Sequence, residues 1–215
     1  LFFILCCLGG IYFLAAPREH KPRDNRFAVN AETLKHMVLG QGLMIADLFW
    51  IRLIQEIDYS ESKGQVVNKG WSFHMLDAVT TLDRRYWMAY RAGVTVLSVL
   101  VQDVEGARLL YDRAVTHYPQ DWPLHYRAAY HYLYEVKDCK KAADLLVKAG
   151  ALGAPQWVSA LAGRLYTKAG QTELARTVLL DALERFKDTD VEGRIKERLE
   201  ALNRNQSSTQ DIPCQ

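Results

Sequence analysis

The sequence predicts an all-α protein, an α-solenoid of about four helix pairs preceded by one N-terminal transmembrane helix. Three observations lead to this fold class. Glycine (13) and proline (6) are scarce among the 215 residues, which favours long helices joined by short turns. A pattern of small and large apolar residues recurs about every 34 residues, as in stacked helical repeats. An uncharged apolar segment, residues 1–16, opens the sequence.

The composition is that of a folded protein without an electrostatic reason to bind nucleic acid. Hydrophobic residues make up 49% and charged residues 24% of the chain, which argues against wholesale disorder. The 27 basic and 25 acidic residues leave a net charge of only +2. A nucleic-acid-binding protein is expected to carry a basic stripe, so we expect no nucleic acid among the partners.

Residues 1–17 are the expected membrane anchor. The segment LFFILCCLGGIYFLAA contains no charge, and sixteen helical residues span about 24 Å, somewhat less than the roughly 30 Å hydrocarbon core. The alternative is the core of a signal peptide, for which Pro17 leaves a poor cleavage site. We expect a retained single-pass anchor in the bacterial inner membrane, with residues 1–16 in contact with the lipid.

A basic juxtamembrane linker, residues 18–30, is expected to follow the anchor. It contains Arg18, Lys21, Arg23 and Arg26. Taken alone, these charges would place the following domain on the cytoplasmic side. A short N-terminal anchor in bacteria more often leaves the large domain outside the cytoplasm. A periplasmic location of the helical domain is therefore favoured, and a cytoplasmic location is the alternative.

The internal repeat occupies residues 31–187 and is clearest in three segments. Each segment has a small residue, a large residue four positions later and an alanine three positions after that. Successive segments are 35 and 33 residues apart. The three sets are Ala107/Tyr111/Ala114, Ala142/Leu146/Ala149 and Ala175/Leu179/Ala182.

This pattern resembles the second helix of a tetratricopeptide repeat, in which a small residue lets two helices approach closely. Pro119 stands five residues after Ala114, where that family places the proline that ends a unit. Pro155 stands one residue late in the next unit. The resemblance implies a solenoid in which each helix pair packs only on its neighbours.

The first helices of the units match the family less evenly. In the last unit, Gly163 and Tyr166 occupy the positions of its small residue and its aromatic residue. Tyr130 and Thr95 stand where the two preceding units would have that glycine. The register of residues 86–100 is therefore the least defined by the sequence.

A fourth, degenerate unit is expected before these three. Its two helices are predicted over residues 42–59 and 71–85, because apolar residues recur there at helical spacing. A charged capping helix is predicted at residues 188–204 and a disordered tail at 205–215. The stretches GLMIADLFWIR and DAVTTLDRRYWMAYRAG also resemble a group of bacterial membrane-anchored tetratricopeptide proteins without a defined common activity.

The sequence holds no recognisable catalytic, cofactor-binding or metal-binding motif. It lacks GxSxG, GxGxxG, HExxH and the phosphate-binding GxxxxGK[ST]. His125 and His131 are six residues apart, so on a helix they point in different directions. We expect no enzyme activity, no cofactor, no metal and no small-molecule substrate. A bridge between Cys139 and Cys214 would require an oxidising compartment.

In tetratricopeptide proteins the first helices line a concave groove. The groove positions of this chain combine positive charge with aromatic side chains, which suits an acidic or C-terminal segment of a partner protein. A solvated basic helix face is the alternative. Tyr126 and Tyr130 are expected to pack between neighbouring helices. The expected groove residues are Arg127, His131, Tyr134, Trp157, Arg164 and Lys168.

A second candidate interface lies in residues 43–54, which are apolar around much of a helix. Phe49, Trp50 and Leu53 are its candidate contact residues. A helix of this kind is buried either by its own solenoid or by another subunit.

These features predict a non-catalytic protein–protein interaction scaffold. We expect an accessory or assembly subunit of a multi-protein membrane complex. The alternative is a transient peptide-binding adaptor or chaperone-like receptor that uses the basic, aromatic groove. An enzyme with an unrecognised site is the third hypothesis.

Overall fold

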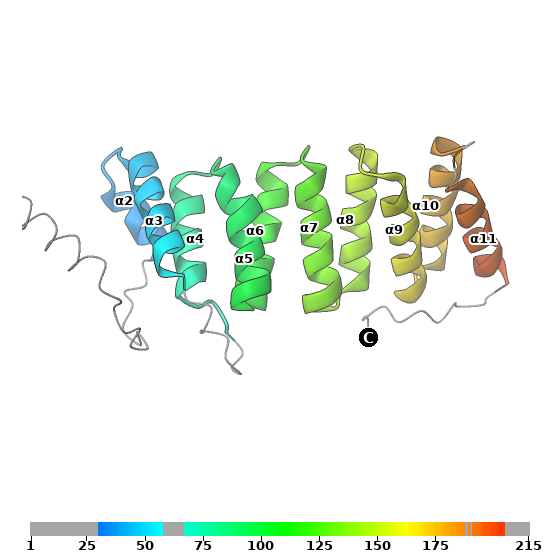
Figure 1. Ribbon diagram of the computed structural model, residues 1–215, viewed down its shortest axis with the longest axis horizontal. Helices are drawn as coiled ribbons and strands as arrows, with labels where there is room; N and C mark the ends of the chain where they lie inside the picture. Colours follow the sequence, from blue (N-terminus) through cyan, green and yellow to red (C-terminus); the bar gives the residue numbers. More distant parts are fainter. Residues whose placement is uncertain (1–29, 58–66, 188, 190, 205–215) are drawn as a thin grey trace, which may run out of the picture.

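The structure, a computed structural model, describes residues 30–57, 67–187, 189 and 191–204. This part of the chain is helical and contains no strand. The helices stand side by side in one elongated row (Figure 1). The expected all-α class is confirmed.

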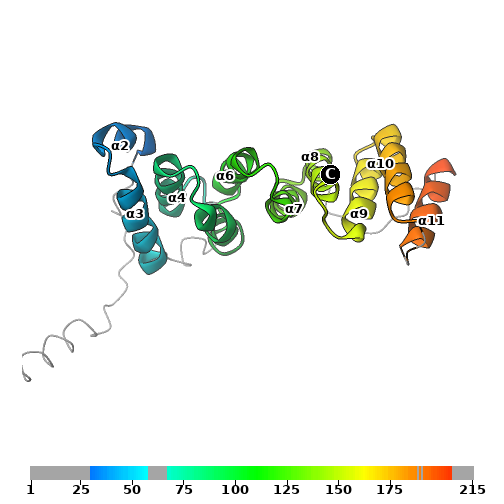
Figure 2. The same cartoon turned by 90° about the horizontal axis from the view of Figure 1, so that it is seen from above.

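From α4 onward, short turns reverse the chain between neighbouring helices, and each helix packs mainly on the one before and the one after it, whereas α2 packs on α4. Seen from above, the row alternates between two layers, with α4, α6 and α8 on one side and α7 on the other (Figure 2). The helices are α2 (Ala31–Met37), α3 (Gly42–Glu56), α4 (Trp71–Leu82), η2 (Ala89–Gly93), α5 (Val94–Val96), η3 (Leu97–Val101), α6 (Val104–His117), α7 (Trp122–His131), η4 (Tyr132–Val136), α8 (Cys139–Ala151), α9 (Gln156–Lys168), α10 (Thr172–Arg185) and α11 (Glu192–Asn203), of which η2, η3 and η4 are π-helical turns.

The same turn precedes α4, α6, α8 and α10. In each case a residue with positive φ is followed directly by the residue that caps the next helix. Three of the four residues are not glycine, and a positive φ costs such a residue about 1 kcal/mol or more, a cost that the packing of the helices must offset. The pairs are Lys69/Gly70, Gln102/Asp103, Lys137/Asp138 and Gly170/Gln171, at intervals of 33, 35 and 33 residues.

The residues of the sequence repeat lie in the core, and the alanines among them are fully buried. Alanine at these positions leaves room for the neighbouring helix. Gly163 of α9 has the same role, because a Cβ there would lie 2.7 Å from Cγ and Cδ2 of Leu179 on α10. Close helix approach through small residues is therefore a property of this row, as the pattern predicts.

The helices of the first predicted unit are shorter than expected. α3 ends at Glu56 and α4 ends at Leu82, where Asp83 leaves the helical conformation. The Asp83 carboxylate accepts a hydrogen bond from the Arg85 N–H (2.8 Å), which fixes a turn in place of another helical residue.

Residues 86–101 show why their register is hard to predict. The closest helix approach occurs at Gly93, where a Cβ would lie 2.5 Å from Leu76 Cδ2 and 3.1 Å from Trp50 Cζ3. Thr95, at the position where the glycine is expected, instead donates to the Arg91 carbonyl (2.9 Å). The π-helical turns on either side of α5 change the facing of its side chains relative to a regular α-helix.

None of the described helices is long and apolar enough to cross a membrane. The longest, α3, has 15 residues, and such a helix measures about 22 Å against a hydrocarbon core of roughly 30 Å. The prediction of a single-pass membrane protein is wrong on this finding. The segments predicted as anchor (1–17) and tail (205–215), and all but the last residue of the linker, lie outside the described residues.

Candidate protein-binding surface

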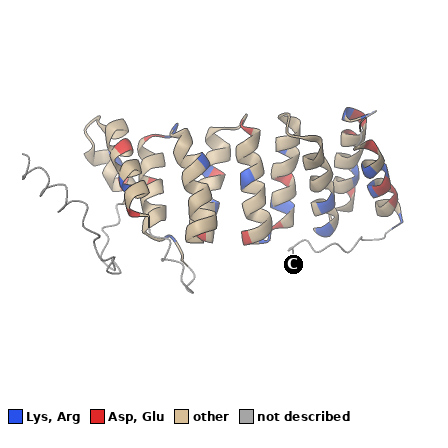
Figure 3. Ribbon diagram, viewed as in Figure 1, with Lys and Arg blue, Asp and Glu red and all other residues tan. Residues whose placement is uncertain are grey.

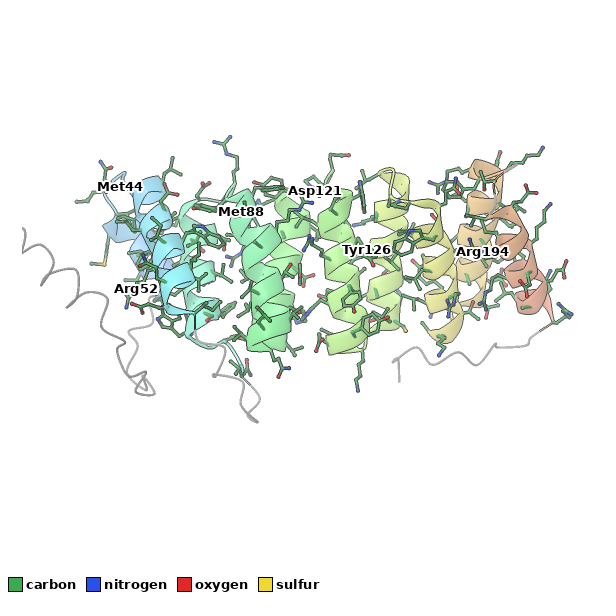
Figure 4. All side chains as sticks on the ribbon, viewed as in Figure 1. Met44, Arg52, Met88, Asp121, Tyr126 and Arg194 are labelled. Carbon is green, nitrogen blue, oxygen red and sulfur yellow. The ribbon has the colours of Figure 1, made fainter. Side chains whose placement is uncertain are left out.

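Four aromatic side chains of α7, η4 and α9 gather on one surface. The rings of Tyr126 and Trp157 meet edge to face, with centroids 5.5 Å apart. The rings of Tyr130 and Tyr134, one helical turn apart, have centroids separated by 4.3 Å. Tyr126 also interacts electrostatically with Tyr130 and Tyr134. Tyr126 lies between α7 and α9 in the view of Figure 4. We call these four residues the aromatic cluster.

The aromatic cluster is largely open to solvent. Tyr130 is 50% exposed, Trp157 46% and Tyr134 44%, whereas Tyr126 is half-buried against the core. The prediction that Tyr130 packs between neighbouring helices is therefore wrong, and the same prediction for Tyr126 is met only in part. A folded protein rarely exposes adjacent large rings without a use for them, and such patches commonly mark interaction sites.

Arg164 of α9 borders the aromatic cluster. Burial is the main cause that lowers the pKa of its guanidinium, and the nearby positive charge of Arg198 on α11 lowers it further, while Tyr134 acts in the opposite direction. Arg198 and Tyr134 therefore lie near enough to Arg164 to influence its charge. A carboxylate bound by Arg164 would also be attracted by Arg198, and a guanidinium can donate two hydrogen bonds to it.

The remaining basic residues of the predicted groove are placed differently. Arg127 donates to Thr95 Oγ1 (3.1 Å), so its guanidinium reaches toward α5. Lys168 is exposed in the last turn of α9. The structure therefore brings Tyr134, Trp157 and Arg164 to one surface, whereas Arg127 belongs to a contact between helices.

His131 does not line a groove, because it is only 1% exposed. Its Nε2 lies 3.0 Å from the Val104 carbonyl and its Nδ1 lies 2.7 Å from Ser98 Oγ. A carbonyl oxygen can only accept, so Nε2 carries the proton and the Nδ1 of the neutral ring accepts from Ser98. His131 is thus a buried residue that joins α7 to α6 and η3, and the prediction that it contacts a partner is wrong.

Burial of His131 makes folding stability sensitive to mild acid. Burial is the main cause that lowers the pKa of the imidazole below its usual value; the charge of Arg108 adds to this, while the bond to Val104 and the charge of Asp112 oppose it. The unfolded chain therefore takes up the proton at a higher pH than the folded protein. The stability that the neutral, buried His131 contributes is complete above the pKa of about 6.5 that histidine has in the unfolded chain. It is lost as the pH falls through the lower pKa of His131 in the folded protein.

We expect the free energy of unfolding of the wild type, measured with urea, to fall between pH 7.5 and pH 5 because of His131. The variant His131→Gln, whose side chain does not titrate, should lack this part of the pH dependence. The measurement is the free energy of unfolding at each pH for both proteins. A His131 imidazole whose NMR titration midpoint lies at or above about 6.5 would contradict the assignment.

The three candidate contact residues of the second interface are covered by the row itself, which is one of the two alternatives for this helix. Leu53 is buried in the core, and Phe49 and Trp50 are half-buried against it. The Trp50 ring lies 5.7 Å from that of Tyr86, centroid to centroid. These three residues hold α3 onto the rest of the row and do not form an exposed contact surface.

The aromatic cluster and Arg164 offer apolar area and a positive charge side by side. Comparison with protein-family models, characterised proteins and solved structures finds no match for this chain. The proposed function therefore rests on the exposed rings of the aromatic cluster and on the charge of Arg164.

The described residues include no group of three or more His, Cys, Asp or Glu that could hold a metal ion. Cys139, buried at the start of α8, is disulfide-bonded, and the other three cysteines lie outside the described ranges. A depression of about 580 Å³ adjoins the turn between α6 and α7, but its Asp121 already caps α7 and accepts a hydrogen bond from Trp87 Nε1 (3.3 Å).

Proposed function

We propose that this chain is a non-catalytic protein–protein interaction scaffold of the tetratricopeptide type, acting as an accessory or assembly subunit of a multi-protein complex. The repeated turns before α4, α6, α8 and α10 support the repeat assignment, because their intervals of 33, 35 and 33 residues bracket the period of about 34 residues of that family.

Contacts between neighbouring units support the same assignment. Several side-chain hydrogen bonds join residues about one repeat apart, as expected when equivalent positions of stacked units lie side by side. They join Arg113 Nη1 to Thr80 Oγ1 (2.7 Å), Ser98 Oγ to His131 Nδ1 (2.7 Å), Tyr118 Oη to the Arg85 carbonyl (2.6 Å) and Arg127 Nη1 to Thr95 Oγ1 (3.1 Å).

The exposed aromatic cluster beside Arg164 is the observation that carries the proposed function. Tryptophan, tyrosine and arginine are the residues that most often dominate the energy of protein interfaces. The rings would cover an apolar side chain of the partner, and Arg164 with Arg198 would bind its carboxylate. We therefore propose an acidic segment or a chain terminus of another protein as the ligand.

A transient peptide-binding adaptor is the second candidate. The two neighbouring guanidiniums favour it, because they suit a short segment that ends in a carboxylate. Purification from the native source distinguishes the two. An assembly subunit would elute with partners of fixed composition, whereas an adaptor would lose its ligand on dilution.

Trp157→Ala is expected to weaken partner binding about 30-fold or more, because removal of a central aromatic contact commonly costs 2 kcal/mol or more. Trp87→Ala is the matched control, since Trp87 is also a partly exposed tryptophan but lies outside the aromatic cluster. The measurement is the amount of each co-purifying protein with the tagged wild type and the two variants. Equal recovery with all three proteins would contradict the proposed site.

A further inference from the structure

The two ends of the helical row differ in chemistry. The last helix, α11, carries charged residues of both signs, which are dense in this region of the row (Figure 3). A terminal helix with a charged outer side ends a stack of repeats in contact with water. At the other end of the row, α3 presents apolar side chains instead. The charged residues of α11 are Glu192, Arg194, Lys196, Glu197, Arg198 and Glu200.

The exposed apolar residues at this end lie along one side of α3 and in the turn before it. They are between 49% and 92% exposed. They occupy an arc of roughly 140° around the helix, opposite the side on which Leu53 enters the core. Figure 4 shows Met44 at this end of the row. We call these residues, Leu39, Leu43, Met44, Leu48, Ile51 and Ile54, the α3 face.

Two charged residues accompany the α3 face, Asp47 within its arc and Arg52 at its border. Burial is the main cause that raises the pKa of the Tyr86 hydroxyl, and the nearby Asp47 raises it further. Arg52 lies 3.6 Å from a Glu56 carboxylate oxygen and stacks over the Trp71 ring at 6.0 Å. Figure 4 labels Arg52 at the same end of the row. When another protein surface covers the α3 face, the charge of Arg52 therefore keeps its partners within the chain.

We infer that the α3 face is a twofold interface with a second copy of this chain. At the exposures observed, the six side chains present on the order of 700 Å² per chain, close to the roughly 800 Å² that each partner buries in an interface of standard size. A mostly apolar face can pair with itself because it needs no complementary charge. The inference does not depend on the proposed function of the aromatic cluster.

The geometry also limits the assembly to two copies. An isologous contact uses the same surface on both chains, so it is saturated by one partner. The opposite end of each row is the charged helix α11, which offers no second apolar face. The product would be a dimer joined through the two copies of α3, with an α11 at each outer end.

The test uses the full chain and a substitution that places a charge in the α3 face. Leu48→Glu is expected to convert a particle with the mass of two chains into one with the mass of a single chain, with dimerisation weakened at least tenfold. Leu180→Glu on α10 is the control, because Leu180 is comparably exposed outside the face. The masses are measured by light scattering during size-exclusion chromatography, with circular dichroism to verify folding.

A wild type with the mass of one chain, or a dimer that survives Leu48→Glu, would overturn the inference. A photoreactive residue at position 51 gives a second readout that does not depend on the stability of the Leu48 variant. The expected product is a covalent dimer whose crosslinked peptide comes from α3 of a second chain. A crosslink to residues 1–29 of the same chain, or to another protein, would show that a different segment covers the face.

Discussion

Replacing Asp103 with alanine is expected to lower the free energy of unfolding by about 3 kcal/mol or more, the sum of a lost helix cap and of buried N–H groups left without an acceptor. Asp103 is fully buried between α4 and α6. Its Oδ1 accepts from the N–H groups of Gly106 (2.9 Å) and Lys69 (3.0 Å), and its Oδ2 accepts from Gly70 (2.8 Å). One carboxylate thus caps α6 and fixes the start of α4.

Asp138→Ala is the matched control for this substitution. Asp138 occupies the equivalent turn one unit later and caps α8 through the Lys141 N–H (2.9 Å), but it is exposed. Its loss should cost only about 1 kcal/mol, the usual value of a helix cap. The measurement is urea unfolding of both variants. Equal destabilisation by the two substitutions would show that the contacts of Asp103 with α4 contribute nothing.

Gly163→Val is expected to destabilise the fold by about 3 kcal/mol, because added atoms would overpack the contact between α9 and α10. A Cβ at Gly163 would lie 2.7 Å from Leu179 Cγ, and Leu179 is itself buried. The branched side chain of valine would have to displace the helix rather than one flexible end of the leucine. Thermal and urea unfolding of the variant measure the effect.

Gly193→Ala in α11 provides the opposite case. Apart from its chain neighbours and the backbone of its own helix, no atom lies within 4 Å of a Cβ built at Gly193, so the substitution adds no clash. Alanine in a helix is favoured over glycine by about 0.5–1 kcal/mol. A stable Gly163→Val variant, together with the expected gain at Gly193, would contradict the close packing of α9 on α10.

The row of paired helices could be anticipated because its cause is visible in the sequence. Two helices approach closely only where small side chains meet, so alanine and glycine must recur at fixed intervals. The buried Ala107, Ala142 and Ala175 follow this rule. The repeated turns could not be anticipated, because Gln102 and Lys137 are not residues that normally adopt positive φ.

The placement of groove residues was less predictable, because it depends on how each helix is rotated. Tyr130 stands where the repeat family has glycine and is too large for a close helix contact, so it points to solvent. The π-helical turn that follows α7 changes the facing of subsequent residues. His131, which precedes this turn, is buried because its ring bonds to Ser98 and Val104, and a register counted from an ideal repeat does not reveal those partners.

Contacts between elements distant in sequence were also missed. Arg198 lies in a helix that the sequence marks only as a cap, and its proximity to Arg164 depends on the packing of α11. On α3, apolar spacing predicts a helix but does not decide which side faces the core. Phe49, Trp50 and Leu53 turned out to be the inner side, and the α3 face is the outer one.

Binding of a partner protein at the aromatic cluster is tested most directly by photo-crosslinking in the native cell. A photoreactive residue is placed at position 130, within the aromatic cluster, or at position 180 on α10, which is equally exposed. The predicted result is a crosslink from position 130 to one or a few specific proteins that are absent at position 180. No crosslinked protein at position 130, or the same set of proteins at both positions, would contradict the proposed role of this surface.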